Sequence, residues 1–305
     1  MDAPERPLEP SRDLRERWLR VLAELAQDAV DARRLGPSSG PLGAAAERAA
    51  DELAVPIPEK PLAGGVEAVA ERLRRAAAVG LVPAHAGYLA YVPGAGLFAS
   101  ALADLVAGSL NRFTGLGAAS PALCRLEEDV VRWLAAECGY GPGAGGVLLS
   151  GGSLANLAAV ITAREERVRP ADDPRRLTAY ASSQAHHCVA KAFRLAGLPP
   201  AGVREIPVDS RFRMDVAALA TAIAADRRAG LQPLVTVASA GTTNTGALDD
   251  LHAVADACAR EGVWFHVDGA YGGAFVLCDE GRRLLSGLER ADSIALDPHK
   301  GLFLP

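Results

Sequence analysis

An acid and an amine near the end of the sequence could together bind a charged ring: Asp268, within WFHVDGAYGG, and Lys300, within DPHKG. A carboxylate that ends a buried strand needs a partner, because an isolated buried charge is costly, and a ring N–H would serve. A lysine behind a proline-rigidified turn can form a Schiff base with a carbonyl group. Each residue also has an ordinary interpretation, as a helix N-cap for Asp268 and as a solvated side chain for Lys300.

Three further segments carry groups suited to a planar, anionic ligand. In SGGSLANL the glycines allow close backbone approach, Ser153 offers a hydroxyl, and the next helix would point free N–H groups at a phosphate, although such a turn can also be purely structural. In SSQAHHCVAKA an imidazole could lie on a flat ring or hydrogen-bond a carboxylate, with a polar turn or a zinc site as alternatives. Adjacent side chains rarely reach one ion, so we expect no metal. SAGTTNTGALDD fits either a ligand contact or a loop.

A regular succession of apolar runs would position these segments. The runs begin about 26 to 31 residues apart, which leaves room for one crossover helix in each interval. This spacing predicts βα units that form a mostly parallel sheet, and such sheets bind ligands at the carboxyl ends of their strands. Each segment that carries candidate ligand-binding groups directly follows one of the runs. The runs are Val147–Leu149, Leu177–Ala181, Val203–Val208, Leu234–Ala238, Val263–Val267 and Ser293–Leu296.

The first part of the sequence is predicted to be helical. Ser11 could cap a helix with an apolar stripe, and residues 33–43 resemble a linker in composition. Pro121 suits the first position of a later helix. Residues 76–103 contain no charged side chain, but prolines and glycines interrupt them, so a buried loop and helix start are favoured over a membrane span. The predicted helices cover residues 44–53, 66–78, 98–109 and 121–138.

Composition narrows the classes of function and location. The 305 residues are 50% hydrophobic and 23% charged, which is typical of a globular protein, and the net charge of -5 favours neither nucleic acid nor an anionic membrane as partner. The five cysteines form no C-x-x-C pair, and the first residues hold no apolar signal segment. We therefore expect reduced thiols and a cytoplasmic protein.

A phosphate turn, a stacking imidazole, an acid for a ring nitrogen and a Schiff-base lysine are together the groups that pyridoxal phosphate requires. The same residues resemble those of a known family, the group II pyridoxal-phosphate-dependent amino-acid decarboxylases, which includes enzymes for aromatic amino acids, histidine and glutamate. The similarity extends from about His85 to the last residue. It is carried, in the family's order, by HAGYLAYVPGA, NRFTGLGAASPALCRLEEDVVRWL, SGGSLANL, SSQAHHCVAKA, SAGTTNTGALDD, FHVDGAYGGA and DPHKG.

The resemblance implies a role for each matching residue. Lys300 would hold the cofactor covalently, Asp268 would pair with its ring nitrogen, and His186 would stack on the ring; these are the expected catalytic residues. Asp297 stands where some relatives have Asn, an unusual choice beside a phosphate. The other expected cofactor-binding residues are Gly152, Ser153, Thr243, Ala270 and His299. The expected substrate-pocket residues, placed partly across a dimer interface, are Tyr88, Tyr91, Pro93 and Phe113.

The resemblance also implies a fold and an activity. We expect the α/β large domain of a fold type I pyridoxal-phosphate enzyme over residues 111–305, preceded by a helical segment for dimerisation and substrate binding over residues 1–110. Family members continue past the lysine with further strands, a mobile loop and a small domain, so the sequence is expected to lack that C-terminal end. The expected reaction converts an L-amino acid to its amine and carbon dioxide in a homodimer. The alternatives are an aminotransferase or cysteine desulfurase of the same fold, or an inactive cofactor-binding fragment.

Overall fold

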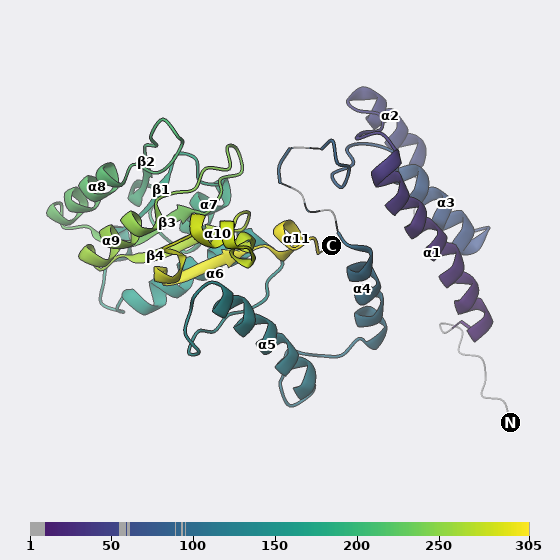
Figure 1. Ribbon diagram of the computed structural model, residues 1–305, viewed down its shortest axis with the longest axis horizontal. Coiled ribbons are helices and arrows are strands. Elements are labelled where there is room, and N and C mark those ends of the chain that lie inside the picture. Colours follow the sequence, from purple (N-terminus) through teal and green to yellow (C-terminus); the bar gives the residue numbers. More distant parts are fainter. Residues whose placement is uncertain are drawn as a thin grey trace. The chain divides into compact units, whose positions relative to one another are not determined.

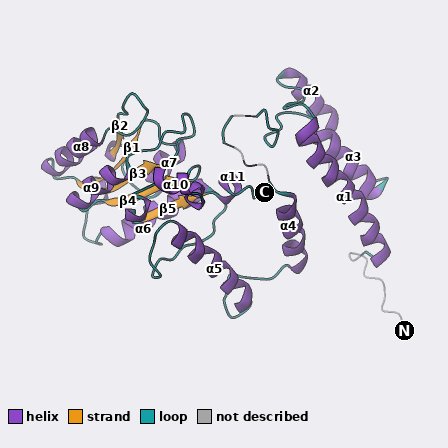
Figure 2. Cartoon of the chain, viewed as in Figure 1, coloured by secondary structure: helices purple, strands orange, loops and turns teal. Residues whose placement is uncertain are grey.

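In the computed structural model, described over residues 10–54, 59, 62–88, 90–92, 94 and 96–304, the chain divides into two units, Met1–Phe98 and Ala99–Pro305. This division precedes the predicted boundary at 110/111, because helix α4 (Phe98–Leu110) groups with the second unit. Figure 1 follows the chain from purple to yellow, and Figure 2 distinguishes its helices from its strands.

The first unit is helical, as predicted. Helix α1 (Arg12–Leu35) begins where the side chain of Ser11 accepts a hydrogen bond from the Leu14 N–H at 3.3 Å. It packs on α3 (Gly65–Ala77), and α2 (Ala44–Leu53) lies between them in the sequence. The predicted linker starts too early, since α1 continues to Leu35 and Gly36 ends it.

The second unit is built on a parallel five-stranded sheet of order β2-β1-β3-β4-β5. All five strands coincide with predicted apolar runs. Both faces of the central strands β1, β3 and β4 are covered, so these strands are almost entirely buried, whereas the edge strand β2 leaves Glu205 exposed. The strands are β1 (Leu177–Ser182), β2 (Val203–Ile206), β3 (Gln232–Ser239), β4 (Trp264–Gly269) and β5 (Ser293–Leu296).

The sixth predicted run, Val147–Leu149, is not a strand. Its backbone pairs with no strand in the described part of the chain, and its side chains are 63%, 51% and 37% exposed. An apolar run becomes a strand only where a neighbouring strand supplies its hydrogen bonds. The sequence pattern alone did not contain that information.

Helices cover the two faces of the sheet. Helix α6 (Gly152–Arg167) packs on β3, β4 and β5, and α7 (His187–Leu195) packs on α6 and β1. Helices α8 (Val216–Arg228) and α9 (Leu251–Glu261) pack on each other and on strands β2 to β4. Because side chains alternate along β4, His266 and Asp268 share one face of the sheet, and Phe265 and Val267 enter the core on the other.

Short helices complete the second unit. They are α10 (Asp279–Leu284), α11 (Pro298–Gly301) and the 3-10 turns η1 (Pro174–Arg176), η2 (Pro200–Gly202), η3 (Gly273–Leu277) and η4 (Leu288–Arg290).

Helices α4 and α5 (Pro121–Glu137) form at the predicted positions, with Pro121 in the first turn of α5. Neither helix has a buried residue, and Leu102 and Leu105 of α4 are about half exposed. The prediction that residues 76–103 form a buried loop and helix start is therefore wrong, because no described element covers the apolar face of α4. Among the described helices, none combines the length and apolar character that a bilayer crossing requires.

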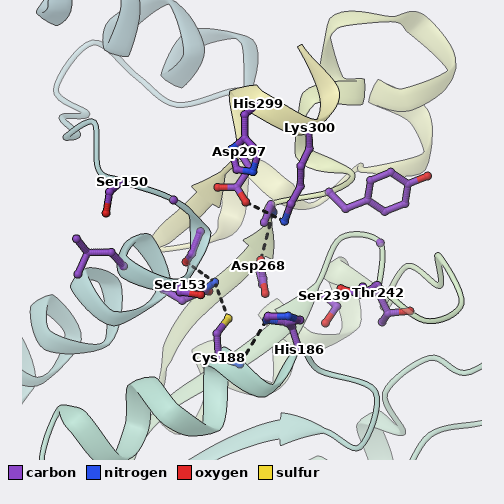
Figure 3. Close-up of a pocket in the computed structure, with 18 residues that line it drawn as sticks. Ser150, Ser153, His186, Cys188, Ser239, Thr242, Asp268, Asp297, His299 and Lys300 are labelled. Carbon is purple, nitrogen blue, oxygen red and sulfur yellow. Dashed lines mark hydrogen bonds and ion pairs between the residues drawn. The ribbon is translucent and has the colours of Figure 1, made fainter. Parts of the chain in front are cut away.

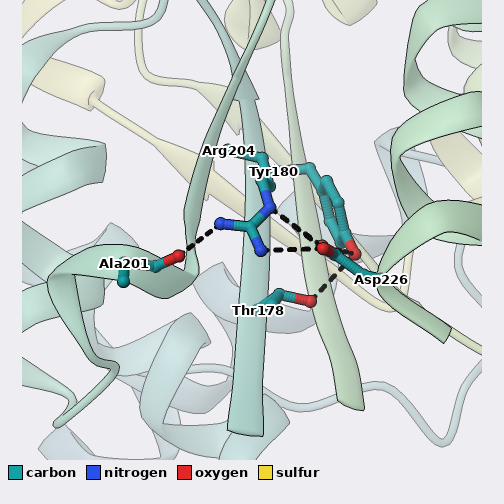
Figure 4. Close-up of polar contacts among 5 residues, drawn as sticks. All are labelled: Thr178, Tyr180, Ala201, Arg204 and Asp226. Carbon is teal, nitrogen blue, oxygen red and sulfur yellow. Dashed lines mark hydrogen bonds and ion pairs between the residues drawn. The ribbon is translucent and has the colours of Figure 1, made fainter. Parts of the chain in front are cut away.

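A buried polar network fixes the edge of the sheet that lies away from β5. Arg204 of β2 donates to both carboxylate oxygens of Asp226 on α8, at 2.7–3.1 Å, and to the Ala201 carbonyl. The Tyr180 hydroxyl of β1 donates to Asp226 at 2.8 Å and lies 2.8 Å from the Thr178 hydroxyl (Figure 4). The charge of Asp226 is thus paired and hydrogen-bonded, which a buried carboxylate requires.

Candidate active site

A cavity of about 370 Å³ lies at the carboxyl ends of the central strands, where a parallel sheet places its ligands. Its walls come from the start of α6, the start of α7, the loops after β3 and β4, and α11 (Figure 3). The structure thereby gathers every residue that was expected to bind a cofactor. These lining residues are Gly152, Ser153, His186, Thr243, Asp268, Ala270, Asp297, His299 and Lys300.

One end of the cavity is the N-terminus of α6. Gly151, which precedes the helix, has φ +141°, a conformation that L side chains rarely adopt. No side chain caps this helix, so its first N–H groups have no side-chain partner and the positive end of its dipole lies at the cavity. A Cβ atom on Gly152 would lie 2.7 Å from Oδ2 of Asp297, so a larger residue would require that carboxylate to move.

Lys300 and Asp297 form an ion pair inside the cavity. Lys300 Nζ lies 2.8 Å from Asp297 Oδ2, and the side chains are 25% and 4% exposed. Pro298 opens α11 and fixes the turn that separates the two residues. The lysine is therefore not a solvated surface side chain, which was its ordinary interpretation.

Asp268 ends β4 with 8% of its surface exposed. Its carboxylate accepts a hydrogen bond from the Ala270 N–H at 3.2 Å, the one partner it has within the described residues. The N-cap interpretation fails, because the next helical turn is η3 and its cap is Gly272. A buried carboxylate with one weak partner has capacity for a further donor from a ligand.

His186 caps α7 and also lines the cavity. Its Nδ1 accepts the Cys188 N–H at 3.3 Å, so the neutral ring carries its proton on Nε2. Its centroid lies 4.0 Å from that of His187. Burial first, and then the neighbouring His187, lower the pKa of His186, so the ring is neutral at neutral pH. The polar-turn interpretation and a ligand-facing role both apply to this residue.

Comparison with known proteins decides the family. The profile described as "Pyridoxal-dependent decarboxylase conserved domain" matches residues 49–304. The chain belongs to this family. It is 38% identical over 221 residues to the aromatic-L-amino-acid decarboxylase of Bacillus atrophaeus. The match covers 72% of this chain and 46% of that protein. With the Bos taurus aromatic-L-amino-acid decarboxylase it shares 37% identity over 260 residues, 78% of this chain and 52% of that protein.

The fold of this pyridoxal-dependent decarboxylase chain agrees with that of solved relatives. The crystal structure of Oryza sativa TDC with PLP and tryptamine superposes with a TM-score of 0.88 at 31% identity, over 98% of this chain and 63% of that one. The α/β fold with a parallel sheet is thus the one expected from the sequence. The chain spans about half the length of the relatives that it matches.

The residues of the cavity fit pyridoxal phosphate, the cofactor of the family. The uncapped N-terminus of α6 suits a phosphate, the free capacity of the Asp268 carboxylate suits a ring N–H, and Lys300 provides the amine. Asp297 is the exception, because its carboxylate lies beside Gly152 at the anion end. The ammonium group of Lys300 compensates its charge.

Several lining residues were not anticipated from the sequence. Asn156 and Cys188 are buried residues of the cavity wall, and burial raises the pKa of the Cys188 thiol to about 11, so it stays protonated. Cys188 belongs to the segment SSQAHHCVAKA, for which a zinc site was one alternative; no group of potential metal ligands occurs in the described ranges. Ser239 also lines the cavity, and its position at the end of β3 could have identified it from the sequence. The remaining unanticipated lining residues are Ser150, Leu154, Gly241, Thr242 and Tyr271.

Of the expected substrate-pocket residues, only Phe113 lies in the same unit as this cavity within the described part of the chain. Tyr88 and Tyr91 belong to the first unit, and Tyr91 is 79% exposed. Phe113 is in the second unit but is 67% exposed and does not line the cavity. Pro93 lies outside the described residues. The substrate-pocket role of all four stays a prediction.

Proposed function

We propose that this chain is the cofactor-binding part of a pyridoxal-phosphate-dependent decarboxylase that converts an L-amino acid to the corresponding amine and carbon dioxide. One observation carries the proposal: the 370 Å³ cavity combines an uncapped helix N-terminus, a buried carboxylate with free acceptor capacity and a partly buried lysine. An anion, a ring nitrogen and a carbonyl group each find a matching partner there. Family membership supports the same conclusion.

Each group has a distinct task. Lys300 would bind the carbonyl group covalently until the substrate amine replaces it, and Asp268 would keep the ring nitrogen protonated. Bound pyridoxal phosphate supplies a ring that withdraws the electron pair left when carbon dioxide departs. Gly152 and Ser153 would hold the phosphate, with Thr243, Ala270 and His299 around the ring. The Nε2–H of His186 could donate to the substrate carboxylate or return a proton to the product.

The setting of the reaction belongs to the same proposal. We infer a cytoplasmic homodimer, because the cysteines of the described chain are all free and the exposed apolar faces of α4 and α5 need a cover. Tyr88, Tyr91, Pro93 and Phe113 would shape the substrate pocket, partly across the dimer interface, with residues 1–110 as the dimerisation segment. The relatives named as aromatic-L-amino-acid decarboxylases make aromatic L-amino acids the first substrates to test.

Product analysis tests the proposal. The chain is incubated with pyridoxal phosphate and a panel of aromatic, acidic and basic L-amino acids, and amine, carbon dioxide and 2-oxo acid are measured. Amine and carbon dioxide in equal amounts support decarboxylation, and a 2-oxo acid without carbon dioxide would instead identify an aminotransferase. Lys300→Met should abolish the product, whereas the matched change Lys191→Met, at an exposed lysine of α7, should not. Cofactor binding without any product would favour the inactive fragment.

A further inference from the structure

A chain of buried hydrogen bonds connects β4 and β5 with the first turn of α6. Trp264 Nε1 donates to Ser293 Oγ at 2.8 Å, and Ser293 Oγ lies 2.9 Å from His266 Nδ1. His266 Nε2 lies 2.9 Å from Asn156 Oδ1, and Asn156 Nδ2 donates to the Gly152 carbonyl at 2.9 Å. His266 and Asn156 are 0% and 1% exposed, so water does not compete for these contacts.

The direction of each hydrogen bond follows from its ends. The Gly152 carbonyl can only accept, so the amide nitrogen of Asn156 faces it and the amide oxygen faces His266. That oxygen can only accept, so His266 carries a proton on Nε2. Its Nδ1 lies 2.9 Å from the Ser293 hydroxyl and 3.1 Å from the Ser293 carbonyl. In the neutral ring Nδ1 accepts from the hydroxyl, which in turn accepts from Trp264. Burial supports this assignment, because it lowers the pKa of His266 to about 4 and keeps the ring neutral.

The chain of hydrogen bonds connects the first turn of α6, at one end of the cavity, with strand β4, which carries Asp268 at the other end. Gly152 opens α6, where no side chain caps the helix and the phosphate would bind. Two residues after His266, on the same face of β4, stands Asp268, which would bind the ring nitrogen. Asn156 also lies 3.7 Å from the Cys188 thiol, behind the turn that holds His186. The strands of the sheet pair through their backbones, so the fold of the sheet does not require His266 or the hydrogen bond between Asn156 and Gly152.

We propose that His266 and Asn156 are positioning residues that hold the first turn of α6 in the orientation required to bind the cofactor phosphate. This inference rests on the proposed function. The two side chains do not touch the cofactor themselves. They fix the direction of the Gly152 carbonyl, and thereby of the adjoining N–H groups, relative to the strand that carries Asp268.

The ratio of affinities for pyridoxal phosphate and pyridoxal isolates this role, because the two ligands differ only in the phosphate. Asn156→Leu removes the side-chain hydrogen bond to the Gly152 carbonyl and leaves the Nε2–H of His266 without a partner. It should weaken the binding of pyridoxal phosphate by about tenfold, while the binding of pyridoxal changes little. His266→Phe should act in the same direction. His266→Gln, whose amide can replace the Nε2–H donor, should restore most of the ratio.

Tyr180→Phe is the matched control, because it removes a buried hydrogen bond from the polar network far along the sheet (Figure 4). It should lower stability without changing the ratio. A wild-type chain that binds both ligands equally would refute the proposed function. A wild-type chain that prefers pyridoxal phosphate, with Asn156→Leu and His266→Phe unchanged in that preference, would refute only the positioning role.

The proton position of His266 can be measured without any variant. Long-range ¹H–¹⁵N NMR of the wild-type chain between pH 5.5 and 8 should show a protonated Nε2 and an unprotonated Nδ1. Protonation at Nδ1, or a ring that is charged at pH 6, would contradict the hydrogen-bond directions on which the inference depends.

Discussion

Acidification should destabilise the folded chain through His266. The ring is fully buried, and burial lowers its pKa from 6.5 to about 4. Between these two pH values the unfolded chain has bound a proton on this residue and the folded chain has not, so the free energy of unfolding falls as the pH falls. At about 1.4 kcal/mol for each pH unit between the two pKa values, the loss totals about 3.5 kcal/mol, of which about 2 kcal/mol has occurred by pH 5.

Urea denaturation at pH 7.5, 6 and 5, followed by circular dichroism, gives the free energy of unfolding of the wild type and of His266→Gln. The variant cannot take up this proton, so the wild type should lose about 2 kcal/mol more than the variant between pH 7.5 and 5. His252→Gln, at an exposed histidine of α9, is the matched control. Equal losses in the wild type and in His266→Gln would refute the neutral, buried histidine.

Further changes test the rest of the site and the fold. Asp268→Asn removes the charge that would hold a ring proton, and should reduce kcat for decarboxylation by about a hundredfold or more while the chain still binds pyridoxal phosphate. Asp297→Asn removes a negative charge beside Gly152, and should tighten the binding of inorganic phosphate, measured by calorimetry, by about tenfold; weaker binding would show that the acid assists the anion. Tyr180→Phe should lower the free energy of unfolding in urea by about 1–2 kcal/mol, and no change would mean that the network around Asp226 is not stabilising.

The sequence predicts most of the sheet because the central strands are buried on both faces and each interval between strands is long enough for a helical crossover. It fails at Val147–Leu149, where apolar character is present but no neighbouring strand supplies hydrogen bonds within the described residues. Helix starts at Ser11 and Pro121 were predictable, because the cap and the first-turn proline act locally. The exposure of α4 was not predictable, since burial depends on which other elements pack against a helix.

The site was predictable as far as it follows the ends of strands. Asp268, Lys300 and His186 come directly after apolar runs, and parallel strands bring those positions to one edge. Asn156 could not be found in this way. Its importance comes from contact with His266, 110 positions away in the sequence, and no local pattern encodes that distance. The ion pair between Asp297 and Lys300 is likewise a property of the folded turn.

Covalent labelling tests the central claim most directly. The sequence contains the lysines Lys60, Lys191 and Lys300. Reduction of the purified chain with borohydride in the presence of pyridoxal phosphate, followed by peptide mapping, should place the label on Lys300, and Lys191→Met should leave the yield unchanged. Label on Lys60 or Lys191, with Lys300 unmodified, would contradict the assignment of this cavity as the cofactor site.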